Sequence, residues 1–313
     1  MSRGTLTLLA ARADGSVTIG PDDSPPTTTL TTGSNLDTAV HAMNDALRLD
    51  PGATLLAVAD TTTQGLVHHV AWHGTLPASW NPPAPWRTVP FGEVLATLAP
   101  TVAGRLRAAS RAGILGKRTV HLHDGLRPGA RPTKSERTAA QFTWHARTPT
   151  AEEDERVRQV WGWLTDACGR VLVVVDRHGA PGLPGGCPEP GESRSATLAR
   201  ETLEEAAAHH GQPAVLGFQH VTEAGRAPYL QLRMTAPLLD VGPAAPDPDN
   251  GEIYQRVLVP AAQANLLLGW GPEGDAQAAA VASAFPRAHD CALRHVPEHG
   301  WMPEGACQAG SVS

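Results

Sequence analysis

Two stretches of the chain alternate apolar and polar residues on either side of a turn signal. Residues 5–20 flank Asp14 and Gly15, a pair that favours a tight hairpin turn, and residues 157–176 flank Gly169 in the same way. Each stretch therefore predicts a β-hairpin. Further strand-like segments follow both hairpins, at residues 53–60, 65–74, 215–221, 228–238 and 253–260.

Apolar residues at helical spacing follow each hairpin as well. Residues 35–52 predict a helix with Asp37 as its N-cap and Pro51-Gly52 as its stop signal, and residues 195–210 predict the corresponding helix of the second half. Residues 91–109 and 275–285 are also expected to be helical. Both halves thus run through hairpin, loop, helix, strands, loop and helix, which indicates a divergent internal duplication.

The chain of 313 residues is too long for one ordinary core and fits two domains. We expect domains at residues 1–110 and 141–290. Residues 111–140, rich in Gly, Pro, Arg and Lys, are expected to link them, and residues 291–313 to form a C-terminal tail.

Composition and charge narrow the classes of partner. Hydrophobic residues make up 41% and charged residues 18% of the chain, and the net charge is −6, which argues against a general grip on nucleic acid or on an anionic membrane. Neither a signal peptide nor a membrane span is predicted. The four cysteines lack the spacing of a disulfide framework, so we expect reduced thiols and a cytoplasmic protein.

The second-half helix carries Glu201, Glu204 and Glu205 within about a third of its circumference. Like charges at this spacing repel, by about 0.2–0.5 kcal/mol for each pair, unless a cation lies among them. Hard carboxylate oxygens suit Mg²⁺ or Mn²⁺, and such ions bridge carboxylates to phosphate oxygens. We expect the opposite face to pack on the core through Ala196, Ala199, Leu203, Ala206 and Ala207.

A glutamate-rich helix is in most proteins only a solvated surface. The loop before this helix is therefore needed to distinguish a functional site from such a surface. That loop holds Gly185, Gly186, Pro188, Pro190 and Gly191. It brings backbone groups close to the acidic face. Arg200 is expected to pair with Glu192 and hold the loop against the helix.

These residues resemble a known family. Gly186, Glu192, Arg200-Glu201 and Glu204-Glu205, at their spacing and preceded by the string LPGG from Leu183, resemble the Nudix box of the Nudix hydrolases. The resemblance implies the Nudix α/β/α sandwich with a mixed sheet, an α/β fold, for residues 141–290. Residues 1–110 repeat the strand order without the acids and resemble a degenerate Nudix-like domain.

The resemblance also implies an activity, which is Mg²⁺- or Mn²⁺-dependent hydrolysis of a diphosphate bond in a nucleoside diphosphate linked to another moiety. Arg200, Glu201, Glu204 and Glu205 would be the catalytic residues. Glu201, Glu204, Glu205 and a carbonyl of Gly185 or Gly186 would be metal ligands, and Glu201 or Glu204 would also orient or deprotonate the attacking water. A homodimer is plausible on the same grounds.

Two positions depart from the family pattern, since Thr202 stands where a bulky aliphatic residue is usual and Ala207 where glycine is usual. Both affect the packing of the helix rather than its chemistry. Members often use an acidic residue outside the box. The candidates here are Glu223, Asp247, Asp249 and Glu252, and the sequence does not choose among them.

The sequence leaves the function and the substrate class open. A Nudix-fold sensor that binds a nucleotide and barely hydrolyses it is the alternative function. The substrate class is also open among nucleotide sugars, modified nucleoside triphosphates and a specialised metabolite diphosphate. A zinc site of Cys291, His295, His299 and Cys307 fits no standard spacing.

Overall fold

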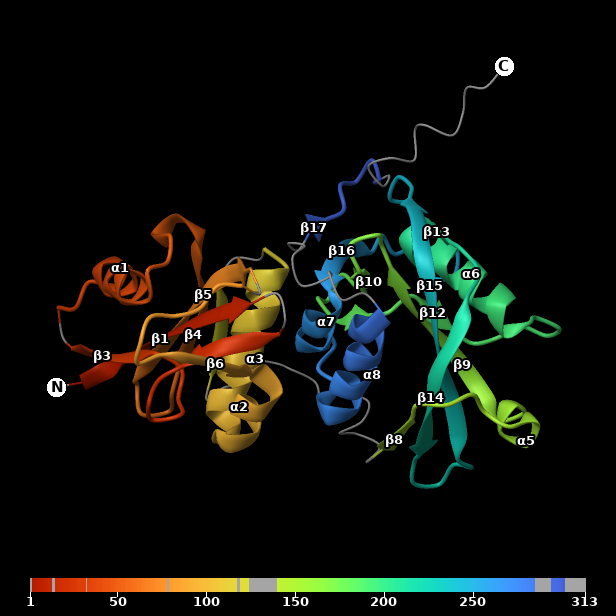
Figure 1. The fold of residues 1–313 in the computed structure, drawn as a ribbon, viewed down its shortest axis with the longest axis horizontal. Helices are drawn as coiled ribbons and strands as arrows, with labels where there is room; N and C mark the ends of the chain where they lie inside the picture. Colours follow the sequence, from red (N-terminus) through yellow and green to blue (C-terminus); the bar gives the residue numbers. More distant parts are fainter. Residues whose placement is uncertain are drawn as a thin grey trace, which may run out of the picture. The chain divides into compact units, whose positions relative to one another are not determined.

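The computed structural model describes residues 2–12, 15–31, 33–77, 79–116, 119–123, 140–284 and 294–301 (Figure 1). The chain divides into two compact units, Met1–Arg131 with Asn265–Gly271, and Pro132–Ala264 with Pro272–Ser313. Among the described residues, no helix is both long and apolar enough to cross a bilayer. Most of the predicted linker and tail lies outside these residues.

The N-terminal unit is built on a mixed sheet with the order β6-β2-β1-β5-β4-β7, and β3 pairs with β1. The central pair β1 and β5 is parallel, and Trp72 of β5 is packed so tightly against α3 that a Cβ at Gly113 would lie 2.1 Å from its Cδ1. The elements of this unit are β1 (Ser2–Arg12), β2 (Ser16–Ile19), β3 (Thr27–Thr31), α1 (Leu36–Leu47), β4 (Thr54–Thr61), β5 (Val67–Leu76), β6 (Arg87–Pro90), α2 (Phe91–Thr97), α3 (Pro100–Ile114) and β7 (Val120–His123).

Several local predictions for this unit need correction. Asn35, and not Asp37, caps α1, because its side chain accepts from the Thr38 N–H at 3.1 Å. The helix predicted at residues 91–109 is two helices that meet at Pro100, a residue that suits the first turn of a new helix. Strands β3 and β6 were not predicted, and Asp14 of the predicted turn lies outside the described residues.

The C-terminal unit has the order β17-β16-β10-β9-β15-β14-β8. Strands β9 and β15 run parallel at its centre, and every other neighbouring pair of this order is antiparallel. The elements are β8 (Gln141–His145), α5 (Ala151–Asp154), β9 (Val157–Thr165), β10 (Arg170–Val175), β11 (Pro181–Gly182), β12 (Gly185–Gly186), α6 (Arg194–Ala206), β13 (Ala208–His210), β14 (Ala214–Thr222), β15 (Tyr229–Val241), β16 (Gln255–Pro260), α7 (Ala261–Leu268), α8 (Gly271–Ala284) and β17 (Arg294–His295).

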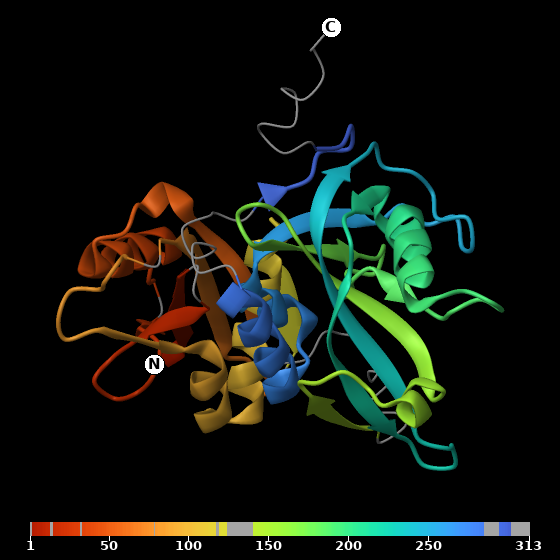
Figure 2. The same cartoon turned by 45° about the vertical axis from the view of Figure 1, so that its right-hand side comes forward.

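Helices α6 and α8 lie on opposite faces of this sheet, which makes an α/β/α sandwich (Figure 2). On the α6 face, Leu198 packs so closely that a Cβ at Gly162 would lie 2.7 Å from its Cδ1. On the other face, Gln277 of α8 accepts hydrogen bonds from Trp163 at 3.3 Å and from Arg233 at 3.0 Å. The predicted fold class is confirmed for this unit.

The strand plans of the two units agree. The path β6-β2-β1-β5-β4 has the same neighbours and the same relative directions as β16-β10-β9-β15-β14. The two paths end at β4 and β14, and each of these strands follows a helix in the sequence. Helix α1 precedes β4, and α6 precedes β14. Both helices end in a left-handed residue other than glycine, Arg48 with φ 56° and Ala207 with φ 50°. The outermost strands differ, because β7 joins β4 in parallel and β8 joins β14 antiparallel.

The face of α6 that packs on the core differs from the predicted one. Leu198, Thr202 and Ala206 are buried, whereas Leu203 is 50% exposed. The predicted stripe is wrong for Ala196, Ala199 and Leu203, all of which are exposed. The acids border the buried stripe instead of lying opposite it, because the helix turns them toward the sheet edge at β12. The helix also ends at Ala206, since His209 and His210 belong to β13.

The end of α6 generates a stability prediction. Ala207 occupies the left-handed region, which costs an L-residue about 1–2 kcal/mol that glycine does not lose. Ala207→Gly should therefore raise the free energy of unfolding by about 0.5–1 kcal/mol, after the added freedom of the unfolded glycine is subtracted. Urea unfolding followed by tryptophan fluorescence measures the change.

Ala206→Gly is the matched control, because Ala206 is buried and helical. It should lower the free energy of unfolding by about 1 kcal/mol or more. If both glycines destabilise the protein to a similar degree, the left-handed strain at Ala207 is not real.

Candidate active site

The loop between β10 and α6 closes on the sheet edge at two glycines. Gly185 and Gly186 form β12, which pairs with Trp161 and Val160 of β9. A Cβ at Gly185 would lie 2.2 Å from the Val160 carbonyl oxygen, and one at Gly186 would lie 2.2 Å from Glu201 Oε1. Gly185 is therefore required by the backbone of β9, whereas a side chain at Gly186 would displace the carboxylate of Glu201.

Glu205 of α6 reaches the same edge. Its Oε2 accepts a hydrogen bond from the Gly185 N–H at 3.0 Å. Burial raises the pKa of Glu205 to about 8, and the charges of Glu201, Asp247 and Glu204 add to the effect while the Gly185 N–H opposes it. Burial raises the pKa of Glu201 too, against the lowering effect of Arg200. This edge of the sheet therefore concentrates carboxyl groups that resist ionisation together.

Arg200 is the cation of the site and contacts all but one of the acids. Its Nε donates to Glu192 Oε1 at 2.8 Å, its Nη1 to Glu204 Oε2 at 2.8 Å, and its Nη2 lies 3.0 Å from Glu201 Oε1. Hydrogen bonds to Glu192, above all, raise the pKa of Arg200, and the same pair lowers the pKa of Glu192 to about 2. The Cys187 carbonyl accepts from Nη2 at 3.0 Å, so Arg200 also ties the loop to the helix.

Sequence reasoning missed the second support of Glu192. Thr197 is fully buried, and its hydroxyl donates to Glu192 Oε2 at 3.0 Å. Ser193 caps α6 by accepting from the Ala196 N–H at 3.2 Å. A serine directly after Glu192 and a threonine one turn later were the signal available in the sequence.

No group of three His, Cys, Asp or Glu side chains in the described part of the chain is already gathered as metal ligands. The reason is that Arg200 holds Glu201 and Glu204 while Glu205 holds the Gly185 N–H. The donor set itself suits a hard divalent cation, since it offers carboxylates and the carbonyls of a glycine edge that no side chain blocks. Such an ion would be held by Glu201, Glu204, Glu205 and Gly186, and Arg200 would first have to release Glu201 and Glu204.

The four acidic candidates outside the box lie in different surroundings. Asp249 is exposed, and its charge is among those that raise the pKa of Glu201, after burial. Asp247 is buried and accepts from the Asp249 N–H at 2.8 Å and from Asn250 Nδ2 at 3.2 Å. Glu252 accepts from the Arg177 N–H, and Glu223 from the Tyr229 hydroxyl at 3.2 Å. Asp249 is thus the candidate with a free carboxylate beside the acidic helix.

Other residues of this unit have local roles. Trp163 is fully buried in the core, and its indole N–H donates to Gln277. His295 lies on β17 and contacts Gln255 Nε2 at 3.4 Å, whereas Cys291 and Cys307 lie outside the described residues. Thr202 is fully buried, and its hydroxyl has no hydrogen-bond partner among the residues that the structure describes.

With this geometry in hand, the C-terminal unit can be compared with known proteins. Residues 155–280 match the family model described as the NUDIX domain. This part of the chain belongs to the Nudix family. No curated protein matches the chain significantly.

Solved structures similar to this chain include the following three proteins. A mutant of the Bacillus subtilis pyrophosphohydrolase BsRppH is 18% identical, with 32% of this chain and 61% of that one covered and a TM-score of 0.28. MutT, from a study of Aliivibrio salmonicida and Vibrio cholerae, is 19% identical, with 40% and 96% covered and a TM-score of 0.29. An Ap4A hydrolase of C. elegans is 15% identical, with 42% and 98% covered and a TM-score of 0.30. The matched region thus spans less than two thirds of the first of these proteins.

Glu205 generates a pH prediction for the metal-free protein. Because its pKa is about 8 in the folded state and near 4.5 otherwise, the folded state binds more protons than the unfolded state between those values. The free energy of unfolding should therefore fall as pH rises from about 5 to about 8. Glu205→Gln should flatten this slope. Urea unfolding in the presence of a chelator at a series of pH values measures both.

Glu152→Gln is the control, because Glu152 is exposed on α5. It should leave the slope unchanged. A wild-type stability that does not fall over this pH range would show that Glu205 is ionised in the metal-free fold.

Proposed function

We propose that this protein hydrolyses a diphosphate bond in a nucleoside diphosphate linked to another moiety, with Mg²⁺ or Mn²⁺ as cofactor. The observation that carries the proposal is that Glu201 and Glu205 lie against Gly186 and Gly185, while Arg200 pairs with Glu201 and Glu204. An acidic surface with no chemical role would not need its carboxylates half-buried against backbone. The NUDIX domain match supports the same class of reaction.

The chain's own residues divide the work in this proposal. Glu192 and Thr197 hold Arg200, and Arg200 keeps the loop and the helix together. Glu201, Glu204 and Glu205 hold the divalent ion with a carbonyl of Gly185 or Gly186. The ion supplies positive charge that stabilises the transition state of phosphoryl transfer. The protein then serves mainly to position the two reacting groups in line.

Asp249 is proposed as the acidic residue outside the box that orients the attacking water. Two observations support this role. The side chain of Asp249 is exposed, and its negative charge is one of the causes, after burial, that raise the pKa of Glu201. Asp247 folds the loop that carries it, through the bonds to Asp249 and Asn250. Tyr254 has no chemical role in this proposal. Its hydroxyl accepts a hydrogen bond from Asn250 Nδ2 at 3.2 Å, which stabilises the same loop.

The N-terminal unit is proposed to be a divergent Nudix-like domain without catalytic activity. The shared strand plan and the matching helix ends support a common origin of the two units. In α1, the only acidic residues are Asp37 and Asp45, so this helix lacks the acidic triplet. All turnover should then depend on the C-terminal unit.

The cellular setting is part of the same proposal. Cys168 and Cys187 are free thiols, which agrees with a reducing cytoplasm. A homodimer is plausible from the family resemblance, and two tandem domains within one chain are the alternative way to form the same interface. A nucleotide sensor with little hydrolysis remains the second candidate, and the Arg200 contacts that occupy Glu201 and Glu204 are the observation in its favour.

The first experiment is a substrate panel with a Glu204→Gln variant. Nucleoside triphosphates, nucleotide sugars, ADP-ribose and dinucleotides are incubated with Mg²⁺ or Mn²⁺, and release of phosphate and monophosphate is measured. We expect turnover of one class, lost by several orders of magnitude in Glu204→Gln because a metal ligand is removed, and retained in the exposed control Glu152→Gln. Binding and a raised melting temperature without turnover would favour the sensor instead.

A second experiment tests Asp249. Asp249→Asn should lower kcat about 100-fold with little change in KM, the usual size of a general acid or base contribution. Glu223→Gln is the comparison, because Glu223 is also acidic and outside the box but is bonded to Tyr229. It should change kcat less than threefold. Equal losses in both variants would remove Asp249 from the mechanism.

A further inference from the structure

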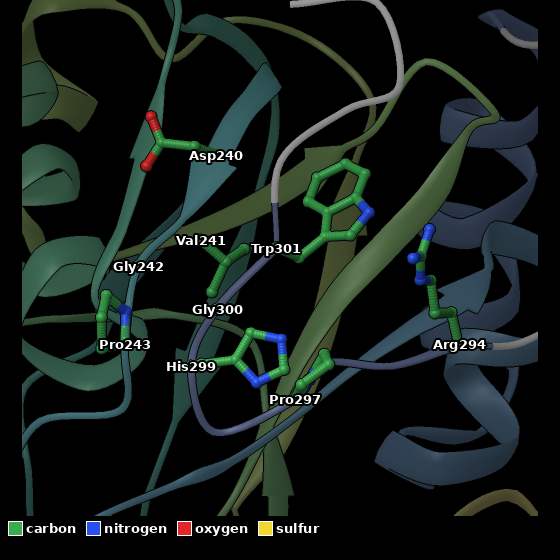
Figure 3. A pocket seen from close by; sticks show the side chains of 9 residues that line it. All are labelled: Asp240, Val241, Gly242, Pro243, Arg294, Pro297, His299, Gly300 and Trp301. Atoms are coloured by element: carbon green, nitrogen blue, oxygen red, sulfur yellow. The ribbon is translucent and has the colours of Figure 1, made fainter.

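The segment that follows the matched domain folds back onto it. Residues 294–301, here named the C-terminal strap, lie beyond residues 155–280. Its first part, β17, pairs with Val257 and Leu258 of β16. At its end, Trp301 and Val241 exchange backbone hydrogen bonds of 2.9 and 2.6 Å. Figure 3 shows Trp301 and Gly300 beside Val241, along a pocket of about 460 Å³.

Arg256 of β16 lies beneath this strap and is 4% exposed. Its guanidinium donates to four backbone carbonyls. Nη1 donates to the Gly242 oxygen at 2.7 Å and to the Ala206 oxygen at 3.2 Å, and Nη2 to the Pro297 oxygen at 3.0 Å and the Glu298 oxygen at 3.4 Å. One side chain therefore joins α6, the end of β15 and the strap.

Such a buried cation is stable only when its donors are satisfied. Ala206 is the last residue of α6, so its carbonyl belongs to the negative end of the helix dipole. A cation at that end is favourable and fixes where the helix stops. A hydrophobic side chain at this position would leave those carbonyls without a partner, which is costly in a buried place.

The contact with Ala206 places Arg256 directly behind the acids. Glu205 is the preceding residue, and Glu204 lies in the same last turn. Arg256 also contacts Gly242, the first residue of the segment that leads from β15 to Asp247 and Asp249. Gly242 is bonded to the end of α6 as well, because its N–H donates to the Ala207 oxygen at 2.7 Å.

We propose that Arg256 is a positioning residue that locks the last turn of α6 to the C-terminal strap and thereby sets the divalent-metal affinity of the acidic site. The inference rests on the proposed function only in assuming that the acids bind a divalent ion. The strap is then a working part of the catalytic unit, although it lies outside the matched domain. Arg256 itself contacts neither metal nor substrate.

The test is Mn²⁺ binding to the full chain, followed by the electron paramagnetic resonance signal of free Mn²⁺, with no substrate present. Arg256→Gln should raise the Kd for Mn²⁺ about tenfold or more, the usual effect of losing an outer support of metal ligands. Arg256→Lys should raise it less, because one donor to the carbonyls is kept. Trp301→Ala, which loosens the strap from Val241, should move the Kd in the same direction.

The matched control is Arg170→Gln. Arg170 lies on β10, which pairs with β16, and is bonded to the buried Asp166 with a distance of 2.6 Å between Nη2 and Oδ2. It is four register positions from Arg256, about 13 Å along the strand. The control should lower the melting temperature and change the Kd for Mn²⁺ less than twofold. A general loss of stability is thereby separated from a loss of positioning.

The outcomes distinguish this inference from the proposed function. If wild type binds Mn²⁺ but hydrolyses nothing, the proposed hydrolase function fails and the Arg256 test still stands. If Arg256→Lys and Trp301→Ala both bind Mn²⁺ with wild-type affinity, or if Arg170→Gln weakens binding as much as they do, the inference is overturned. Should Arg256→Gln not fold, these two variants decide.

Discussion

Crowding of negative charge at the edge strand β12 is the constraint on which the rest of the C-terminal unit depends. Glu201 and Glu205 of α6 lie against the backbone of Gly185 and Gly186, and burial raises the pKa of both carboxyl groups. A cation has to be built in, and Arg200 fills that place. Glu192 fixes the position of this arginine by accepting a hydrogen bond from its Nε, and Thr197 in turn donates to Glu192. Without this support Arg200 could move away and leave the acids uncompensated.

The sheet transmits this constraint to more distant parts of the chain. Because β9 carries the partners of β12, the parallel pair of β9 and β15 fixes where the glycine edge lies. Arg256 on β16 donates to the carbonyl of Ala206, the last residue of α6. Two arginines thus act on α6. Arg200 ties the helix to the loop, and Arg256 binds the backbone at the C-terminal end of the helix.

The pairing of Arg200 with Glu192 was easier to predict from the sequence than the packing of the helix that carries Arg200. The spacing from Gly186 to Glu205 predicted that loop and helix meet, and the hydrogen bonds of Arg200 and Glu205 join them, whereas the chemical roles of these residues stay predictions. The buried face of α6 was assigned wrongly, since its alanines and Leu203 give an ambiguous apolar pattern. The burial of Leu198 and Thr202, and the contact of Leu198 with Gly162, show which side faces inward. Arg256 could not be found in the sequence, because an arginine in a strand shows no sign of the four carbonyls that surround it.

Arg200 supplies Glu201 and Glu204 with a counter-ion from their own helix. In the metal-bound form that we propose, an incoming divalent cation would compete with this guanidinium for the two carboxylates. Because the guanidinium is attached to the same helix, its local concentration does not fall on dilution. The competition would lower the affinity for the ion, so such a site would be filled by an ion that is abundant rather than scarce.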